Sequence, residues 1–465
     1  MGRKSQSIFG DKRLDKGFHV LIAAMAVRHT VVMKELSTTR AEEVQMGRFM
    51  QNPNINPEQL VTHSCSVNPL LLEGKDVLVI SDSSTISFNA YSKREELGHV
   101  GPNTSKDGFS VHPAILMAAD EGSCYGLGGI HFHKTPIAHT EQERAMKKER
   151  RKRSATRAFE DKERYKWFDA PSQAIANCPL AKSYTLIGDR ESDIYDLMAR
   201  TRAKDWHFLY RCKNNRSLSS TEDKDKLYEA IQTWSVAHTF DLALQKTKKR
   251  TAHTATLDVK FGQTQIAKPH INTDKSLPAY LEISVVQVKE RLQTVVGEEK
   301  PVHWILLTSH PVQTLEQALT IIKWYRWRWT IEQLFRTIKK QGFRIEQSKI
   351  ETYHGLINLT TMALLAAIQV MQLVQARAGD TSQNLEDVFY ADECKCIEAL
   401  NQKLEGKTQK QKNPHPTHTL AFGAWVVARL GGWKGYQSES PPGPITFTKG
   451  LTRFYHILEG YQLFS

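Results

Sequence analysis

Residues 183–189 read SYTLIGD, an apolar run that ends in a glycine and an aspartate. The chain continues with ESDIYDLMART at helical spacing and then with HFLYRCK, a second apolar run of strand type. Strand, helix and strand in this order are typical of an α/β layered domain. We therefore expect Asp189 to stand at the carboxyl end of a strand, where open α/β sheets place their functional sites.

A second aspartate occupies the same kind of position earlier in the chain. Asp82 directly follows the apolar strand VLVIS within DVLVISDSSTISF, and the β-type runs VHPAILMAA and YGLGGIHFH come after it. A lone aspartate after a strand is more often a turn former than a ligand. Two aspartates at strand ends of one sheet make a functional role more plausible for each of them than for a lone aspartate. Both are therefore candidates for a functional site.

A third candidate carboxylate lies in residues 325–339, which read YRWRWTIEQLFRTIK. Glu332 is the only acidic residue among the tyrosine, tryptophans, arginines and lysine of this stretch. Thr314 with Gln317 forms a capping box that predicts the helix start, and Gly342 predicts its end.

Four side chains of this predicted helix share one narrow stripe. At about 100° per residue, Tyr325, Arg328, Glu332 and Lys339 lie on one face. If the helix is kinked near Trp329, only Glu332 and Lys339 remain on one face. Ordinary ion pairs on a solvated face are the alternative, but three neighbouring tryptophans disfavour it, and Tyr, Arg and Lys can bond phosphate oxygens.

Together, Asp82, Asp189 and Glu332 suggest a metal site. Three carboxylates can hold two divalent cations about 4 Å apart, an arrangement that supports displacement at phosphorus. Mg²⁺ suits these hard oxygen ligands, and we expect Mn²⁺ to substitute for it.

Composition agrees with a polyanionic partner. Lys plus Arg number 63 against 50 Asp plus Glu, giving a charge of +13, although a merely basic soluble protein remains an alternative. The six cysteines are scattered, which favours reduced thiols in a cytosol. Residues 352–376 are apolar but carry several amides, so a buried helix is favoured over a membrane span.

Changes in hydrophobic periodicity and composition divide the chain into five segments. Residues 1–70 are helical in pattern, 71–213 and 303–377 are α/β, and 214–302 interrupt them with alternating segments typical of antiparallel strands. Residues 378–465 are mixed, with a helix around HTLAFGAWVVARL.

These motifs resemble those of the bacterial IS4 family of DDE transposases, in the branch that includes Tn5 transposase. The Tyr-Arg-Glu-Lys signature of that family is present as Tyr325, Arg328, Glu332 and Lys339. DRESD at 189–193 resembles its second acidic motif, DSST at 82–85 its first, and SIFGDKRLDK its N-terminal element.

The resemblance implies an α/β fold with an RNase H-like catalytic core in two parts, 71–213 and 303–377, and a β-rich insertion at 214–302. It also implies a helical N-terminal DNA-binding domain at 1–70 and a mainly helical C-terminal dimerisation domain at 378–465. Asp82, Asp189 and Glu332 carry over as catalytic metal ligands, and Tyr325, Arg328 and Lys339 as contacts to the end DNA.

The implied activity is cut-and-paste transposition through hairpinned transposon ends. Its expected partners are double-stranded DNA, both transposon ends and target, and a second copy of the chain in a synaptic dimer. No membrane partner is expected, and the implied location is the nucleoid in a bacterial cytoplasm.

Further DNA-facing residues are expected around this core. Related enzymes stack a tryptophan at the position of Trp304 on an extruded base, although a core tryptophan is an equally good interpretation. Arg190 lies within the second acidic motif, and Arg211, Lys213 and Arg216 alternate with the apolar side of a strand. The basic runs 147–153 and 246–250 are further candidates, whereas His131 and His133 are expected to be structural.

Two other functions fit parts of the sequence. A non-catalytic inhibitor derived from a transposase would bind DNA and dimerise, but it has no reason to keep all three carboxylates. A related structure-specific nuclease has no evident need for the N-terminal and C-terminal segments. The acidic triad therefore favours the enzyme.

Overall fold

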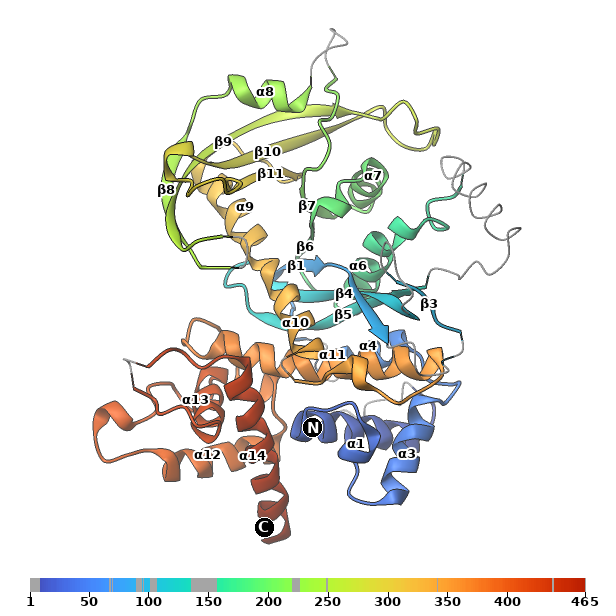
Figure 1. Cartoon of the computed structure of the whole chain (residues 1–465), viewed down its shortest axis with the longest axis vertical. Helices are drawn as coiled ribbons and strands as arrows, with labels where there is room; N and C mark the ends of the chain where they lie inside the picture. Colours follow the sequence, from blue (N-terminus) through green and yellow to red (C-terminus); the bar gives the residue numbers. More distant parts are fainter. Residues whose placement is uncertain are drawn as a thin grey trace. The chain divides into compact units, whose positions relative to one another are not determined.

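A computed structural model of the chain describes residues 9–66, 68, 70–88, 94, 96–100, 107–134, 157–219, 226–247, 250–340, 342–436 and 439–464. The chain forms two compact units (Figure 1). The first unit comprises Met1–Ile137, Asp169–Lys182 and Trp329–Ser465, and the second comprises Ala138–Phe168 and Ser183–Arg328.

The sheet of the first unit is built around one long strand. β4 (Asp107–Ala118) pairs in antiparallel fashion with β1 (Asp76–Ser81), β2 (Ser84–Phe88), β3 (Gly98–His99) and β5 (Cys124–His133). Val77 to Ile80 of β1 are at most 1% exposed, so this strand is buried on both faces, as its unbroken apolar run indicates. The strands predicted from the apolar runs in this region are confirmed.

Helices from both ends of the chain surround the sheet of the first unit. The N-terminal helices are α1 (Lys12–Arg28), α2 (Met33–Leu36), α3 (Arg40–Met50) and α4 (Pro57–Ser66). The later helices are α10 (Trp329–Lys339), α11 (Tyr353–Ala376), α12 (Ala391–Leu404), α13 (Leu420–Leu430) and α14 (Pro444–Phe464). α6 (Lys166–Ala176) runs across the unit boundary at Phe168.

α11 is the central helix of the first unit. It packs on β5 and α4 on one side and contacts α1, α10, α13 and α14 on others (Figure 1). Among the described helices it alone is long and apolar enough to cross a membrane, but 83% of its most apolar window is buried inside the structure. This burial confirms the predicted core helix.

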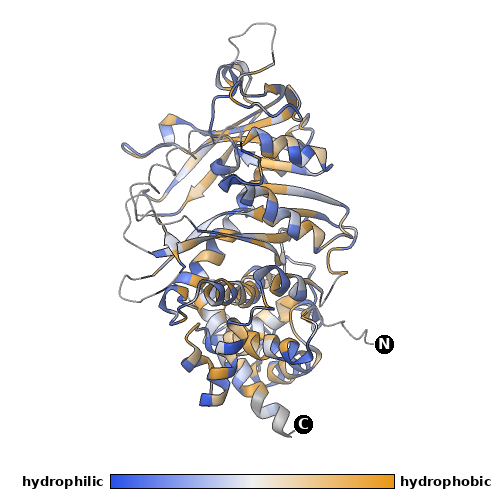
Figure 2. Ribbon diagram, turned by 90° about the vertical axis from the view of Figure 1, so that its right-hand side faces the viewer, coloured by the Kyte–Doolittle hydropathy of each residue, from blue (hydrophilic) through white to orange (hydrophobic). Residues whose placement is uncertain are grey.

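The C-terminal helices form a core with α11. Buried apolar side chains of α12, α13 and α14 pack with Val370, Leu373 and Val374 of α11 and with Ala26 and Val27 of α1. Apolar and polar stretches alternate along the helical ribbons (Figure 2), as expected for helices that bury one face.

The second unit contains one mixed sheet. Its strands follow the order β6 (Ser183–Gly188), β7 (His207–Arg211), β11 (His303–Thr308), β10 (Tyr280–Glu290), β9 (His253–Ala267) and β8 (His238–Leu244). β6 and β7 are parallel, and each later neighbour is antiparallel. The antiparallel strands predicted at 214–302 are thus confirmed, and they extend the sheet of β7 and β11.

In the described part of the second unit, the helices beside these strands are α7 (Tyr195–Ala203), α8 (Leu227–Thr233) and α9 (Leu315–Trp327). The capping box of Thr314 and Gln317 begins α9 as predicted. The helix predicted from Thr314 to Gly342 is interrupted near Trp329, as the alternative of a kink there allows, because α9 ends at Trp327 and α10 begins at Trp329. Of the four-residue stripe, Glu332 and Lys339 therefore share α10, whereas Tyr325 and Arg328 belong to the end of α9.

Candidate active site

Asp82 is the first residue after β1 and lies half-buried before β2. The backbone N–H of Ser83 donates a hydrogen bond to Asp82 Oδ1 at 2.7 Å. The Ser83 hydroxyl forms a 2.9 Å hydrogen bond with Nδ1 of His112, which is buried on β4. The carboxylate is thus held at the end of a fully buried strand, as the sequence predicts.

Glu332 lies half-buried in the first turn of α10. Ile331, Leu334 and Ile338 of the same helix are 0% exposed, so packing within the first unit fixes the rotation of α10 about its axis. A carboxylate in a first helical turn also interacts favourably with the helix dipole.

Lys339 is the last residue of α10 and lies seven positions after Glu332, so the two side chains share a face about 10 Å apart along the axis. Its ammonium group donates a hydrogen bond to the backbone carbonyl of Thr85 in β2. Burial lowers the Lys339 pKa, an effect that Glu346 partly opposes. Within the first unit, this face of α10 therefore meets the strand that follows Asp82.

Asp189 directly follows β6 and caps the short helical turn Arg190–Ser192. Its Oδ1 accepts a 2.7 Å hydrogen bond from the Glu191 N–H, while Oδ2 has no hydrogen-bond partner among the described residues. Gly188 permits this turn, because a Cβ there would lie 2.5 Å from Ser192 Oγ. The predicted position of Asp189 at a strand end is confirmed.

Asp193, to which the sequence analysis assigned no role, organises the segment after β7. Its buried carboxylate accepts hydrogen bonds from the backbone N–H groups of Lys213 at 2.7 Å and Asn214 at 2.9 Å, and from Arg216 Nε at 2.7 Å. The only sequence signal was a second aspartate in the motif DRESD, four residues after Asp189. Asp193 ties that motif to the end of β7.

The DNA contact predicted for Arg216 is corrected by its surroundings. Its side chain is 6% exposed and forms a buried ion pair with Asp193, whose side chain is 0% exposed. A guanidinium enclosed in this way has no surface to offer a phosphate, so we assign Arg216 a structural role. The Lys213 side chain, in contrast, is exposed.

Trp304 and Tyr325 lie together in the second unit. Trp304 is half-buried near the start of β11, and its ring meets the Tyr325 ring at a centroid distance of 5.6 Å. The Arg328 guanidinium lies 5.7 Å from the same tyrosine ring. Tyr325 is 4% exposed, and burial raises the pKa of its hydroxyl.

The Tyr325 hydroxyl makes no hydrogen bond of normal geometry with a described residue. Arg211 and Arg328 nevertheless lie near enough to act against the rise in its pKa. A buried hydroxyl beside two guanidinium groups is suited to donate a hydrogen bond to a phosphate oxygen.

Arg211, at the end of β7, joins this aromatic and cationic cluster. It donates a 2.8 Å hydrogen bond to the His303 carbonyl oxygen. Burial lowers the Arg211 pKa, and the neighbouring charges of Arg190 and Arg328 act in the same direction. Three arginines thus gather beside two aromatic rings, although like charges repel, which indicates an anionic partner.

The three predicted metal ligands are divided between the units. Asp82 and Glu332 belong to the first unit, and Asp189 belongs to the second. No group of three or more His, Cys, Asp or Glu side chains in the described part of the chain is arranged to hold a metal ion. The meeting of these three carboxylates therefore stays a prediction.

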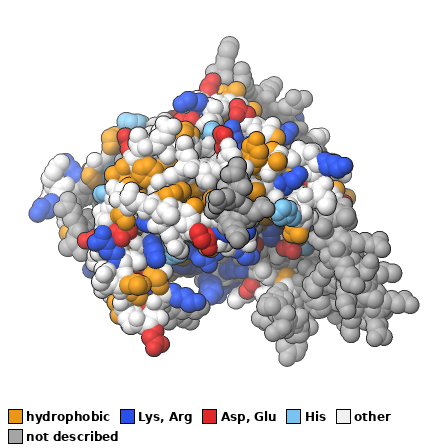
Figure 3. All heavy atoms as spheres, turned by 90° about the horizontal axis from the view of Figure 1, so that it is seen from above, with side chains coloured by type: hydrophobic (Ala, Val, Ile, Leu, Met, Phe, Trp, Pro, Cys, Tyr) orange, Lys and Arg blue, Asp and Glu red, His pale blue; other side chains and the backbone are white. Residues whose placement is uncertain are grey.

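Basic side chains are prominent on the surface. Lys and Arg side chains are visible at many places on the face shown in Figure 3, with acidic side chains between them. The predicted basic run 147–153 lies outside the described residues, as do Lys248 and Lys249 of the run 246–250.

His131 has the structural surroundings that the sequence predicts. Its Nδ1 lies 2.7 Å from a carboxylate oxygen of Asp169. His310 lies in the bend after β11, where its ring stacks on that of His207 with 3.9 Å between centroids and its Nε2 forms a 2.8 Å hydrogen bond with the Thr185 hydroxyl.

The sequence was compared with models of known protein families, and the matching segment contains two of the three predicted metal ligands. Residues 138–368 match the family model of the transposase DDE domain. The matched range contains Asp189 and Glu332, the Trp304 and Tyr325 cluster and the insertion strands, whereas Asp82 lies upstream of it. The match supports a DDE transposase; enzymes of this family bind DNA and in general use divalent metal ions.

Proposed function

We propose that this chain, which carries a transposase DDE domain over residues 138–368, is a cut-and-paste DNA transposase of the IS4 family, similar to Tn5 transposase. The observation that carries the proposal is the family match over the segment in which β6 presents Asp189 and α10 presents Glu332. Asp82, held at the end of β1, supplies the third carboxylate.

The donor set fits divalent metal ions. Asp82, Asp189 and Glu332 offer hard carboxylate oxygens, the type that Mg²⁺ and Mn²⁺ take. Oδ2 of Asp189 has no hydrogen-bond partner among the described residues, which leaves it able to bind a cation. Two bound ions would supply Lewis-acid activation and neutralise charge at the reacting phosphate.

The surrounding side chains would position the DNA. Arg190, Arg211, Arg328, Lys213 and Lys339 contact phosphates, and the Tyr325 hydroxyl donates to a phosphate oxygen. Trp304 stacks on a base that leaves the helix when a hairpin forms. The helices α1 to α4 form the DNA-binding domain.

The proposed reaction begins with water attacking the phosphodiester bond at the transposon end, which frees a 3′-hydroxyl. That hydroxyl attacks the opposite strand, displaces the flanking DNA and closes a hairpin. Water opens the hairpin, and the regenerated 3′-hydroxyl attacks target DNA. The chain acts as a synaptic homodimer in the bacterial nucleoid.

The proposal is tested by incubating the purified chain with Mg²⁺ and DNA that carries the candidate inverted-repeat ends. Nicked, hairpinned and double-strand-broken products are expected, and a chelator should abolish them. Alanine at Asp82, Asp189 or Glu332 should abolish cleavage and leave end binding largely intact. End binding without cleavage in Mg²⁺ or Mn²⁺ would favour the non-catalytic inhibitor, and cleavage without joining would favour a nuclease.

A further inference from the structure

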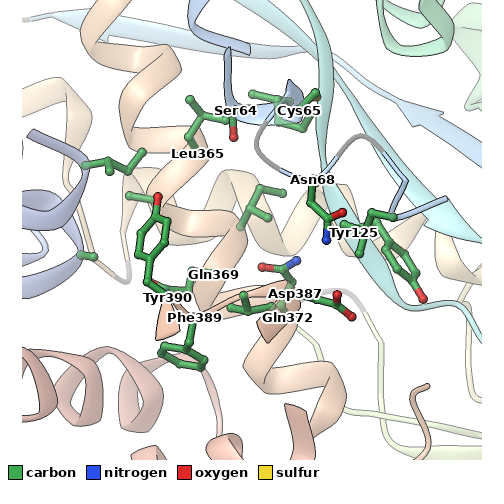
Figure 4. Close-up of a pocket in the computed structure, with 18 of the residues that line it drawn as sticks. Ser64, Cys65, Asn68, Tyr125, Leu365, Gln369, Gln372, Asp387, Phe389 and Tyr390 are labelled. Atoms are coloured by element: carbon green, nitrogen blue, oxygen red, sulfur yellow. The ribbon is translucent and has the colours of Figure 1, made fainter. Parts of the chain in front are cut away.

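A cavity of about 370 Å³ lies within the first unit. Its walls come from α1, α4, β5, α11 and residues 386–393, and none of the residues assigned to the active site lines it (Figure 4). The volume falls within the range of small-molecule sites, about 300 to 1,000 Å³.

The lining has the opposite charge from the chain as a whole. Glu386, Asp387 and Glu393 line the cavity, and the described lining includes no Lys or Arg, in a chain with 63 basic and 50 acidic residues. This reversal favours a cationic occupant over an anionic one.

Glu393 is the most enclosed of these acids, at 8% exposure. Its Oε2 accepts a 2.8 Å hydrogen bond from the Tyr390 N–H. Burial raises the pKa of Glu393 to about 7, and burial likewise raises the pKa of Asp387, which Lys75 opposes only in part. No cation compensates for the burial of Glu393 among the causes of its pKa shift, and Lys75 compensates for that of Asp387 only in part.

Gln372 points independently to a ligand. It lines the cavity, is 6% exposed and makes no hydrogen bond to any described residue (Figure 4). Its neighbour Gln369, one turn earlier on α11, donates a 3.0 Å hydrogen bond to the Tyr455 hydroxyl. An occupant that forms hydrogen bonds would give this amide a partner inside the cavity.

Aromatic and aliphatic side chains form much of the remaining lining, beside polar residues such as Ser64 and Asn68. Phe18, Tyr125, Phe389 and Tyr390 supply rings, and Leu127 and Leu365 supply apolar surface. Aromatic faces attract organic ammonium groups, and apolar walls suit methylene groups. A bare metal ion would leave these walls unused.

We propose that this cavity binds an aliphatic diamine, with one ammonium group at Glu393 and Gln372, the other toward Asp387, and the methylene chain between the apolar walls. The ammonium group donates to the Glu393 carboxylate and to the amide oxygen of Gln372. The cavity is thus a regulatory or stabilising site separate from the DNA chemistry.

The test measures binding to the full chain without DNA. Calorimetry and thermal unfolding with 1,4-diaminobutane are compared with 1,4-butanediol, its uncharged counterpart, and with NaCl at equal ionic strength. We expect one diamine per chain and a rise in Tm, with neither effect from the diol or the salt.

Glu393→Gln and Gln372→Leu should each weaken diamine binding by about tenfold or more. The matched control Glu298→Gln, an exposed acid outside the cavity, should bind as the parent does. If Glu393→Gln does not fold, Asp387→Asn takes its place. Equal stabilisation by the diol, or unchanged diamine binding in the cavity variants, would overturn the proposal.

Discussion

The ring of Trp304 meets the ring of Tyr325 edge to face, with 5.6 Å between their centroids and 63° between their planes. β11 carries the tryptophan and α9 carries the tyrosine, so this contact fixes a helix against a strand within the second unit. Arg328 lies against the same tyrosine ring. In the proposed function, the ring that stacks on a base thus adjoins the guanidinium that binds a phosphate.

Replacing Trp304 with alanine should slow hairpin formation more than the first nick. Base stacking on an aromatic side chain is worth about 1 to 3 kcal/mol, so roughly a fivefold to 150-fold loss is expected. Phenylalanine at the same position should restore part of the rate. The measurement is single-turnover accumulation of nick and hairpin. Equal loss of both steps together with a lowered Tm would show that Trp304 is only a core residue.

Alanine at Arg211 or Arg328 should weaken end binding and make it less sensitive to salt. Each lost phosphate contact should reduce the slope of log affinity against log salt by about one. Binding titrations at several salt concentrations measure the slope. Lys204→Ala, at an exposed position after α7, is the matched control and should keep the parent slope, whereas unchanged slopes in both arginine variants would exclude the proposed contacts.

Asp193→Ala should strongly destabilise the second unit, because it leaves the buried Arg216 guanidinium without its carboxylate. Breaking a buried pair in this way costs about 3 to 5 kcal/mol. Urea unfolding measures the loss. Asp205→Asn, whose parent side chain is 99% exposed in a weak pair with Arg202, should change stability little. A stable Asp193→Ala variant would mean that the pair does not hold the segment after β7.

Much of this arrangement follows from local sequence patterns. Apolar runs that end in Asp82 and Asp189 predict their strand ends, since buried strands need unbroken apolar residues whatever their partners. The capping box at Thr314 likewise predicts a helix start from local hydrogen bonds. In each case, residues that are close in the sequence determine where the strand or helix begins or ends.

What the sequence did not reveal depends on distant residues. The break at Arg328 interrupts a stretch with strong helical periodicity, and no proline or glycine marks it. The enclosure of Arg216 depends on Asp193, 23 positions earlier, so its strand alternation wrongly indicated an exposed cation. The cavity of the first unit is lined by helices from both ends of the chain, so no local sequence pattern predicts it.

His29 should make the first unit less stable in mild acid. Burial lowers its pKa to about 4 from 6.5, and neither ring nitrogen has a partner of good geometry among the described residues. The unfolded chain takes up a proton below pH 6.5 while the folded chain does not, so stability falls as pH drops from 6.5 to 4, by about 3 kcal/mol.

Unfolding of the parent and of His29→Phe between pH 7 and 4 measures this effect. The variant should lose the corresponding part of the pH dependence. Parallel pH profiles for the two proteins would contradict a neutral buried His29.

The proposed active site requires that Asp82, Asp189 and Glu332 bind the same metal ions. It is tested by replacing Mg²⁺ with Fe²⁺ in the complex with end DNA, adding ascorbate and peroxide, and mapping where radicals formed at the iron cut the polypeptide. We predict cuts near all three residues that excess Mg²⁺ suppresses and that Glu332→Ala weakens at every position. Cuts near only one of the three, or cuts that Mg²⁺ does not suppress, would contradict the claim.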